Sequence, residues 1–197
     1  MNKAIISYLG KTVYIGIDVH KETYSLTCIC DKKVVKKATV KAIPDQFADS
    51  IKAWFKDGAK IASVYEAGFS AFTLHRALIK KGIDNIVVNP ASIAIAANDK
   101  VKTDPRDSQR MAVDLADGRL KGINIPTEQE ELDRLLQRTR AQTVEHRATV
   151  SRQIKAKLHQ FGLIAFDSQR MLSNSYIKEL EKKPIALELK TSLGILF

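Results

Sequence analysis

Three strand-like runs follow one another before the first segment with helical periodicity. They cover residues 12–18, 23–30 and 33–40, and each is rich in β-branched and aromatic side chains. The spacers between them are short and charged, which is typical of hairpins. The chain therefore must begin with an antiparallel meander, and this excludes an all-helical fold and an all-parallel sheet.

Helices and strands alternate after the meander. Apolar residues at helical spacing predict helices over 44–56 and 69–81, and strands are expected over 60–66 and 86–88. A meander followed by βαβ units predicts an α/β domain with a mixed sheet covered by helices. Two aromatic residues flank Glu66, and we expect both Tyr65 and Phe69 to pack in the core rather than to stack on a base.

A second region begins near Thr127, which we expect to be the N-cap of a long helix with Glu130 three residues later. No Pro or Gly interrupts the chain from there to Phe161, so the helix is roughly 50 Å long. Its apolar stripe, broken in the middle by polar residues, favours a coiled-coil or interdomain role; it consists of Leu132, Leu135, Leu136, Val150, Ile154, Leu158 and Phe161. We expect domains over 1–122 and 123–197, and a loosely packed helix after Phe166.

The charge of the chain points to a polyanionic partner. The net charge is +10 and the pI is about 9.6, from 32 basic and 22 acidic residues. Between Arg134 and Gln160 the only acidic residue is Glu145, and seven residues are basic: Arg134, Arg138, Arg140, Arg147, Arg152, Lys155 and Lys157. A solvated helix face is the ordinary explanation of such a run, but an anion alongside would relieve the repulsion among these charges, which favours nucleic acid.

Cysteine usage and hydropathy indicate a protein of the reducing cytoplasm. Cys28 and Cys30 lie two apart in a strand-like run, so both point to one face, and two thiols make neither a disulfide scaffold nor a complete zinc site. No run of 18 apolar residues predicts a membrane span, and we expect no membrane partner.

Four carboxylates stand at positions where a metal site could form. Asp18 and Glu66 each lie at the end of a predicted strand, and ligands gather outside the carboxyl ends of strands in open α/β sheets. Asp104 and Asp107 lie at a helix start, with Asp104 as the expected N-cap before Pro105. Mg²⁺ prefers such oxygen ligands, and two such ions can stabilise phosphoryl transfer. Taken singly, each residue also has a structural explanation as a strand end or a helix cap.

Four short motifs occur in order: GIDVHK at 16–21, YEAG at 65–68, NPASI at 89–93 and KVKTDPRDS at 100–108. With these motifs the chain resembles the DEDD-type insertion-sequence transposases, the group that includes the pilin-gene invertase. The resemblance runs from about Val13 to Phe161 and includes the segment IPTEQEELDRLLQRTR and the basic helix.

The resemblance implies an RNase H-like (RuvC-like) mixed sheet flanked by helices, followed by a long helical coiled-coil segment. It places the acidic tetrad on Asp18, Glu66, Asp104 and Asp107, as catalytic residues that bind Mg²⁺ or Mn²⁺ and act on DNA in transposition and recombination. It also implies a structured guide RNA and homo-oligomers formed through the long helix. Besides the seven basic residues of that helix, we expect Lys21, Lys102 and Arg106 to contact nucleic acid.

The chain departs from the family pattern in one respect. Family members continue into a domain with a serine nucleophile, and the serines of the tail, Ser168, Ser173, Ser175 and Ser192, lack that motif context. We therefore expect an N-terminal portion that binds metal and nucleic acid without completing recombination. Two alternatives stay open: a non-catalytic regulatory module that binds nucleic acid, and a stand-alone structure-selective nuclease using the same carboxylates. The sequence does not decide whether the chain alone is an enzyme.

Overall fold

The computed structural model describes residues 7–92, 104–164, 173–182 and 184–194, without the side chains at positions 92, 104, 105 and 181. The chain divides into two compact units, Met1–Ile125 and Pro126–Phe197. Each unit has its own buried apolar cluster, and each is described by itself below.

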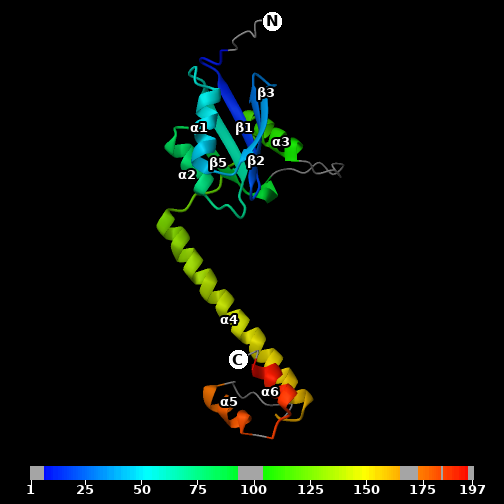
Figure 1. Ribbon diagram of the computed structural model, residues 1–197. Coiled ribbons are helices and arrows are strands. Elements are labelled where there is room, and N and C mark those ends of the chain that lie inside the picture. The colour runs from blue at the N-terminus through cyan, green and yellow to red at the C-terminus, as the bar shows by residue number, and fades with distance from the viewer. Residues whose placement is uncertain (1–6, 93–103, 165–172, 183, 195–197) are drawn as a thin grey trace. The chain divides into compact units, whose positions relative to one another are not determined.

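The first unit is built on a five-stranded mixed sheet with the order β3-β2-β1-β4-β5 (Figure 1). Strand β2 runs antiparallel to both β1 and β3, whereas β4 is parallel to β1 and β5 is parallel to β4. The strands are β1 (Thr12–Val19), β2 (Thr23–Cys30), β3 (Lys33–Lys41), β4 (Lys60–Glu66) and β5 (Asp84–Val88). This is the RNase H-like arrangement, and it confirms the predicted α/β fold.

Helices α1 (Pro44–Trp54) and α2 (Thr73–Lys80) cover one face of the sheet. Alternate residues of the strands point to this face, because successive side chains of a strand alternate between its two sides. Ile15 and Ile17 of β1 are fully buried here, together with Phe47 of α1 and Leu78 of α2. Both cysteines also belong to this cluster, as the two-residue spacing predicted.

Helix α3 (Asp104–Ala116) covers the opposite face. Its Met111 packs against Val64 of β4 and Val88 of β5. Its backbone lies so close to β1 at Gly16 that a Cβ atom there would stand 2.0 Å from the carbonyl oxygen of Ser108 and 2.6 Å from the amide nitrogen of Ala112. The Ser108 hydroxyl is also hydrogen-bonded to that of Thr27, at 2.9 Å in a buried position. The glycine of the GIDVHK motif therefore fixes how closely α3 approaches the sheet.

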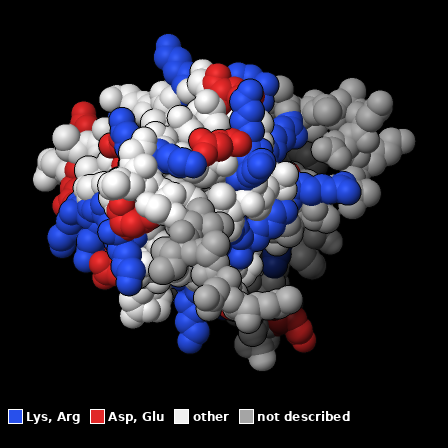
Figure 2. Space-filling model, turned by 90° about the horizontal axis from the view of Figure 1, so that it is seen from above, with Lys and Arg blue, Asp and Glu red and all other residues white. Residues whose placement is uncertain are grey.

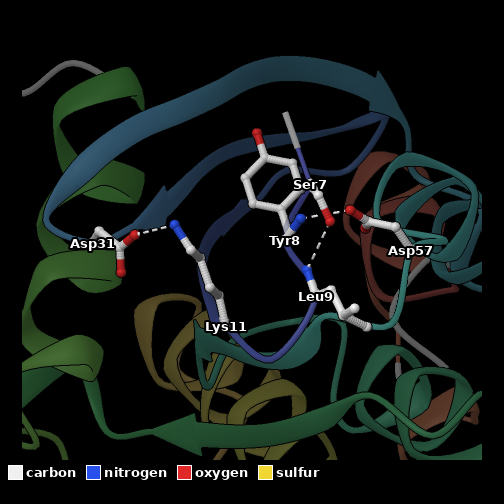
Figure 3. Close-up of polar contacts among 6 residues, drawn as sticks. All are labelled: Ser7, Tyr8, Leu9, Lys11, Asp31 and Asp57. Atoms are coloured by element: carbon white, nitrogen blue, oxygen red, sulfur yellow. Dashed lines mark hydrogen bonds and ion pairs between the residues drawn. The ribbon is translucent and has the colours of Figure 1, made fainter. Parts of the chain in front are cut away.

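The segment before β1 is held by polar contacts at both of its ends (Figure 3). The backbone N–H of Tyr8 donates to the carboxylate of Asp57, and this hydrogen bond lowers the pKa of Asp57. Lys11 forms an ion pair with Asp31, which lies in the β2–β3 turn, with 2.7 Å between Nζ and Oδ2. The hydrogen bond that Lys11 donates to the Asp31 carboxylate raises the pKa of Lys11. The Tyr8 ring meets Phe55 edge-on, which joins this segment to the core.

The second unit consists of the long helix α4 (Glu128–Gln160) and two short helices, α5 (Asn174–Glu181) and α6 (Leu187–Gly194). Helix α4 begins with the predicted capping box: Thr127 Oγ1 accepts from the Glu130 backbone N–H, and the Glu130 carboxylate accepts from the Thr127 backbone N–H. That backbone hydrogen bond lowers the pKa of Glu130. Both bonds satisfy backbone donors at or near the helix start that would otherwise lack partners.

The tail corrects one expectation. Instead of one loosely packed helix, α5 and α6 bury Tyr176, Leu180, Leu189 and Leu193 against Ile154 and Leu158 of α4. Pro184 lies between the two helices, where a proline interrupts helical hydrogen bonding. Within the described ranges, no helix combines the length and the apolar character needed to cross a membrane.

The turn after β4 corrects a second expectation. Helix α2 begins at Thr73 rather than at Phe69, because residues 68–72 form a turn in which Ala71 has a φ of +47°. Tyr65 is fully buried as predicted, and its hydroxyl donates to the Ala71 carbonyl at 3.1 Å. Phe69 is 70% exposed, so its predicted place in the core is wrong.

The thiol of Cys28 makes stability depend on pH at the alkaline end. Burial raises its pKa from 9.0 to about 12, so the unfolded chain releases this proton at lower pH than the folded chain does. The contribution of the protonated Cys28 thiol to the free energy of unfolding is complete below pH 9 and is lost as the pH rises from about 9 toward 12. Between pH 8 and about pH 10.5, we expect the free energy of unfolding of wild type to fall by about 2 kcal/mol more than that of Cys28→Ala, as measured by urea unfolding. Parallel stability curves for the two proteins would contradict this.

Candidate metal and nucleic-acid site

Asp18 and Glu66 point to the same face of the sheet. Asp18 lies two residues after Gly16 in β1, and Glu66 lies two residues after Val64 in β4. Both Gly16 and Val64 face α3, and the side chains of a strand repeat their direction every second residue. The two carboxylates therefore lie on the face that α3 covers, away from the main apolar cluster.

The register of the sheet makes these two residues neighbours. Strands β1 and β4 are parallel, and their pairing continues without a shift from Thr12 opposite Lys60 to Ile17 opposite Tyr65. The next position along each strand is Asp18 and Glu66. Adjacent strands lie about 4.8 Å apart, so the two carboxylates stand on neighbouring strands at the same end of the sheet. Like charges so close together repel each other unless a cation lies between them.

Asp18 is partly covered, with a side chain that is 23% exposed. His20 of the same motif contacts it, with 3.3 Å between His20 Nε2 and Asp18 Oδ2. The imidazole and the carboxylate form an ion pair when the histidine is protonated. His20 comes two residues after Asp18 in the chain, and its contact with that carboxylate places it at the edge of the site.

The first turns of α3 carry the other two predicted carboxylates. The described part of the helix starts at Asp104, which is followed by Pro105. Asp107 is half-buried and stands one turn before Met111, which packs on β4 and β5. Asp104 stands one turn before Ser108, whose hydroxyl contacts β2. Both positions are thus on the side of α3 that contacts the sheet.

Among the described side chains, no group of three or more His, Cys, Asp or Glu residues is close enough to hold a metal ion together. The Asp104 side chain lies outside the described part. What the described structure brings together is the pair Asp18 and Glu66, and it places Asp107 on the helix over the same face. This pair fits Mg²⁺, which is typically bound through one or two carboxylates and retains several of its waters.

The predicted basic residues fall into several groups. Lys21 is exposed in the β1–β2 turn and Arg106 is exposed on α3, whereas Lys102 lies outside the described residues, as does the tail serine Ser168. On α4, Arg134, Arg138, Arg140 and Arg147 are exposed. Arg152 forms an ion pair with Glu145 at 2.8 Å, and Lys157 donates to Ser192 of α6 at 2.6 Å. Arg152 and Lys157 therefore have intramolecular partners, and Lys155 is half-buried.

Sequence reasoning missed the basic edge strand β3. Lys37 is exposed on the face covered by α3 and donates to Gln109 of that helix at 2.8 Å, whereas Lys36 is on the other face, over the Trp54 ring at 4.5 Å. Figure 2 shows a group of Lys and Arg side chains on the side of the view where Figure 1 places β3 and α3. The signal was present in the two consecutive lysine pairs at 32–33 and 36–37.

Comparison with known proteins identifies the family. A family model described as Transposase, of the DEDD IS110 type, matches residues 15–162, and the chain therefore belongs to the DEDD insertion-sequence transposase family. The transposase for insertion sequence element IS1533 of Leptospira borgpetersenii is 33% identical over 136 residues, covering 67% of this chain and 39% of that protein. The chain spans 30–39% of the length of the curated relatives it matches.

Two solved structures are similar to parts of the chain. RuvC of Thermus thermophilus has 11% sequence identity and a TM-score of 0.40, covering 56% of this chain and 99% of that one. The large terminase nuclease of thermophilic phage G20c has 12% identity and a TM-score of 0.37, covering 58% of this chain and 60% of that one. The family predicted from the four motifs is confirmed by the family model and the curated relative.

Proposed function

We propose that this chain is the metal-binding and nucleic-acid-binding portion of an insertion-sequence transposase. The observation that carries the proposal is the placement of Asp18 and Glu66 at neighbouring positions of parallel strands, on the face covered by α3. Asp107 stands on that helix, and Asp104 begins it. The four together are the proposed catalytic carboxylates.

These carboxylates would hold Mg²⁺ or Mn²⁺. A divalent ion bound there supplies Lewis-acid stabilisation of a phosphodiester during strand cleavage or exchange. The protein contributes a rigid frame, because the sheet register fixes Asp18 beside Glu66 and the close contact at Gly16 fixes α3 above them. The His20 imidazole, in contact with Asp18, holds that carboxylate in position.

DNA is the proposed substrate, with a structured guide RNA as a second nucleic-acid partner. The exposed arginines of α4 supply positive charge over several helical turns, which suits phosphate backbones of either kind. We also propose that α4 pairs with a second copy of the chain. Its first half exposes an apolar stripe of Leu132, Leu135 and Leu136, at 58%, 60% and 72%, followed by Val144 at 49%.

Salt dependence tests the nucleic-acid contact. If about six phosphates are contacted, we expect the logarithm of the DNA-binding constant to fall with the logarithm of salt concentration with a slope of about −5. Replacing both Arg138 and Arg140 by glutamine removes two exposed cations and is expected to reduce that slope by about 2. Arg152→Gln, at an arginine already paired with Glu145, serves as the matched control with a smaller effect.

A slope near zero for wild type would exclude DNA binding by these charges. Binding that retains the expected slope but is identical with Mg²⁺, with Mn²⁺ and with chelator would favour the regulatory module, which binds without a catalytic metal. Metal-dependent cutting of branched DNA by this chain alone would favour the stand-alone nuclease. Fluorescence anisotropy and a gel-based cleavage assay on the same DNA distinguish these three results.

A further inference from the structure

A cavity of about 250 Å³ opens between α3 and the edge of the sheet formed by β2 and β3. Its polar lining consists of Ser25, Thr27, Lys37, Thr39 and Ser108. None of the residues that line it carries a carboxylate. Four hydroxyl-bearing residues and one lysine therefore line the cavity, although Thr27 and Ser108 are themselves fully buried, and none of the five belongs to the predicted acidic tetrad.

Hydrogen bonds hold these groups in fixed positions. Thr27 and Ser108 pair at 2.9 Å, and Ser25 and Thr39 pair at 3.3 Å. Lys37 Nζ donates to Gln109 Oε1 at 2.8 Å. An ammonium group has three protons, and a hydroxyl can donate one hydrogen bond while accepting others, so this lining can take on an additional acceptor. Hydroxyl donors beside a cation, with no anion in the lining, select a negatively charged oxygen group.

The sheet register places the cavity beside the proposed metal site. Asp18 of β1 pairs with Ser25 of β2, and Ser25 pairs with Thr39 of β3. Thr39, Ser25, Asp18 and Glu66 therefore form one row across the sheet, on the face that α3 covers. With neighbouring strands about 4.8 Å apart, Ser25 lies about 5 Å and Thr39 about 10 Å from Asp18 along this row. Both distances are of the same order as the separation of successive phosphates in one nucleic-acid strand.

We propose that this cavity binds one backbone phosphate of a nucleic-acid strand, while the next phosphate of the same strand lies at Asp18 and Glu66. The inference rests on the proposed function and adds a subsite to it. Lys37 neutralises the phosphate, and whichever of the Ser25 and Thr39 hydroxyls accepts their mutual hydrogen bond donates its own proton to a phosphate oxygen. The subsite fixes the position of the strand relative to the carboxylates, because phosphate contacts set register and orientation.

The adjacent lysines of β3 provide the test. Lys37→Gln removes the cation of the cavity, and Lys36→Gln removes the same charge one residue away on the opposite face. We expect Lys37→Gln to raise the Kd for a fluorescein-labelled DNA about tenfold and to reduce the salt slope by about 1. Thr39→Val, which removes an exposed hydroxyl at nearly constant volume, is expected to raise Kd by about threefold. Lys36→Gln is expected to stay close to wild type.

The outcomes separate this inference from the proposed function. The subsite is overturned if wild type binds DNA with the expected salt slope and the Kd values are equal for Lys37→Gln, Thr39→Val and Lys36→Gln. The proposed function is unaffected by that result. Failure of wild type to bind DNA at all overturns both. Circular dichroism and thermal melting of each variant show whether the fold is intact. Thr39→Val provides an independent result if Lys37→Gln alters the packing of α3 through Gln109.

Discussion

Replacing Gly16 by alanine is expected to destabilise the first unit by about 3 kcal/mol or more, because the added Cβ overlaps the backbone of α3. The built Cβ lies 2.0 Å from the Ser108 carbonyl oxygen and 2.6 Å from the Ala112 amide nitrogen. Backbone atoms cannot rotate away as a flexible side chain can. The helix must therefore shift from the sheet, which breaks the buried hydrogen bond between Ser108 and Thr27.

Urea unfolding of Gly16→Ala measures this effect, with Gly68→Ala as the control. At Gly68 the nearest atom to an added Cβ is 3.9 Å away, which is ordinary contact, so that variant is expected to lie within about 0.5 kcal/mol of wild type. Because α3 carries Asp104 and Asp107, the shift in Gly16→Ala is also expected to weaken metal binding in the protein that remains folded. A Gly16→Ala protein as stable as wild type would show that α3 does not contact β1 so closely.

The second large effect is expected from the carboxylates themselves. Asp18→Asn and Glu66→Gln keep the size of each side chain but remove its charge, and each is expected to weaken Mn²⁺ binding at least about tenfold. In the metal-free protein the same changes relieve repulsion between neighbouring carboxylates, so thermal stability is expected to hold or rise. Addition of Mn²⁺ is then expected to raise the Tm of wild type and to have little effect on either variant.

Titration calorimetry and thermal melting with Mn²⁺ check these expectations. Asp84→Asn is the matched control. Asp84 is the first residue of β5, whereas Val88, which pairs with Glu66, is the last, so Asp84 lies at the far end of the strand from the site. Its ion pair with Lys60 is exposed, at 3.7 Å, and contributes little. Unchanged affinity in both Asp18→Asn and Glu66→Gln, or an equal loss in Asp84→Asn, would contradict the assignment of the site.

The order of the elements in the first unit was predictable from periodicity and turn residues, because these are local properties. The strand pairing was not: nothing within 12–19 or 60–66 specifies that Asp18 lies beside Glu66. The family resemblance implied that the two belong together, and the parallel register supplies a physical reason. The role of Gly16 was also invisible, since it depends on a helix that begins 88 residues later, at Asp104.

The wrong predictions have physical causes as well. Phe69 was assigned to a helix and to the core from hydropathy, but the turn at residues 68–72 directs it to solvent. The tail was expected to pack loosely because its apolar residues are scattered, yet α5 and α6 bring Leu180 and Leu189 together on α4.

A crystal structure of the chain grown with Mn²⁺, analysed by anomalous scattering, tests directly whether Asp18 and Glu66 hold a metal ion. We expect an anomalous peak between the carboxylates of Asp18 and Glu66, with Asp107 or Asp104 completing the ligands from α3. A map without such a peak at saturating Mn²⁺, in crystals where both carboxylates are well ordered, would contradict the claim that this face of the sheet holds a catalytic metal.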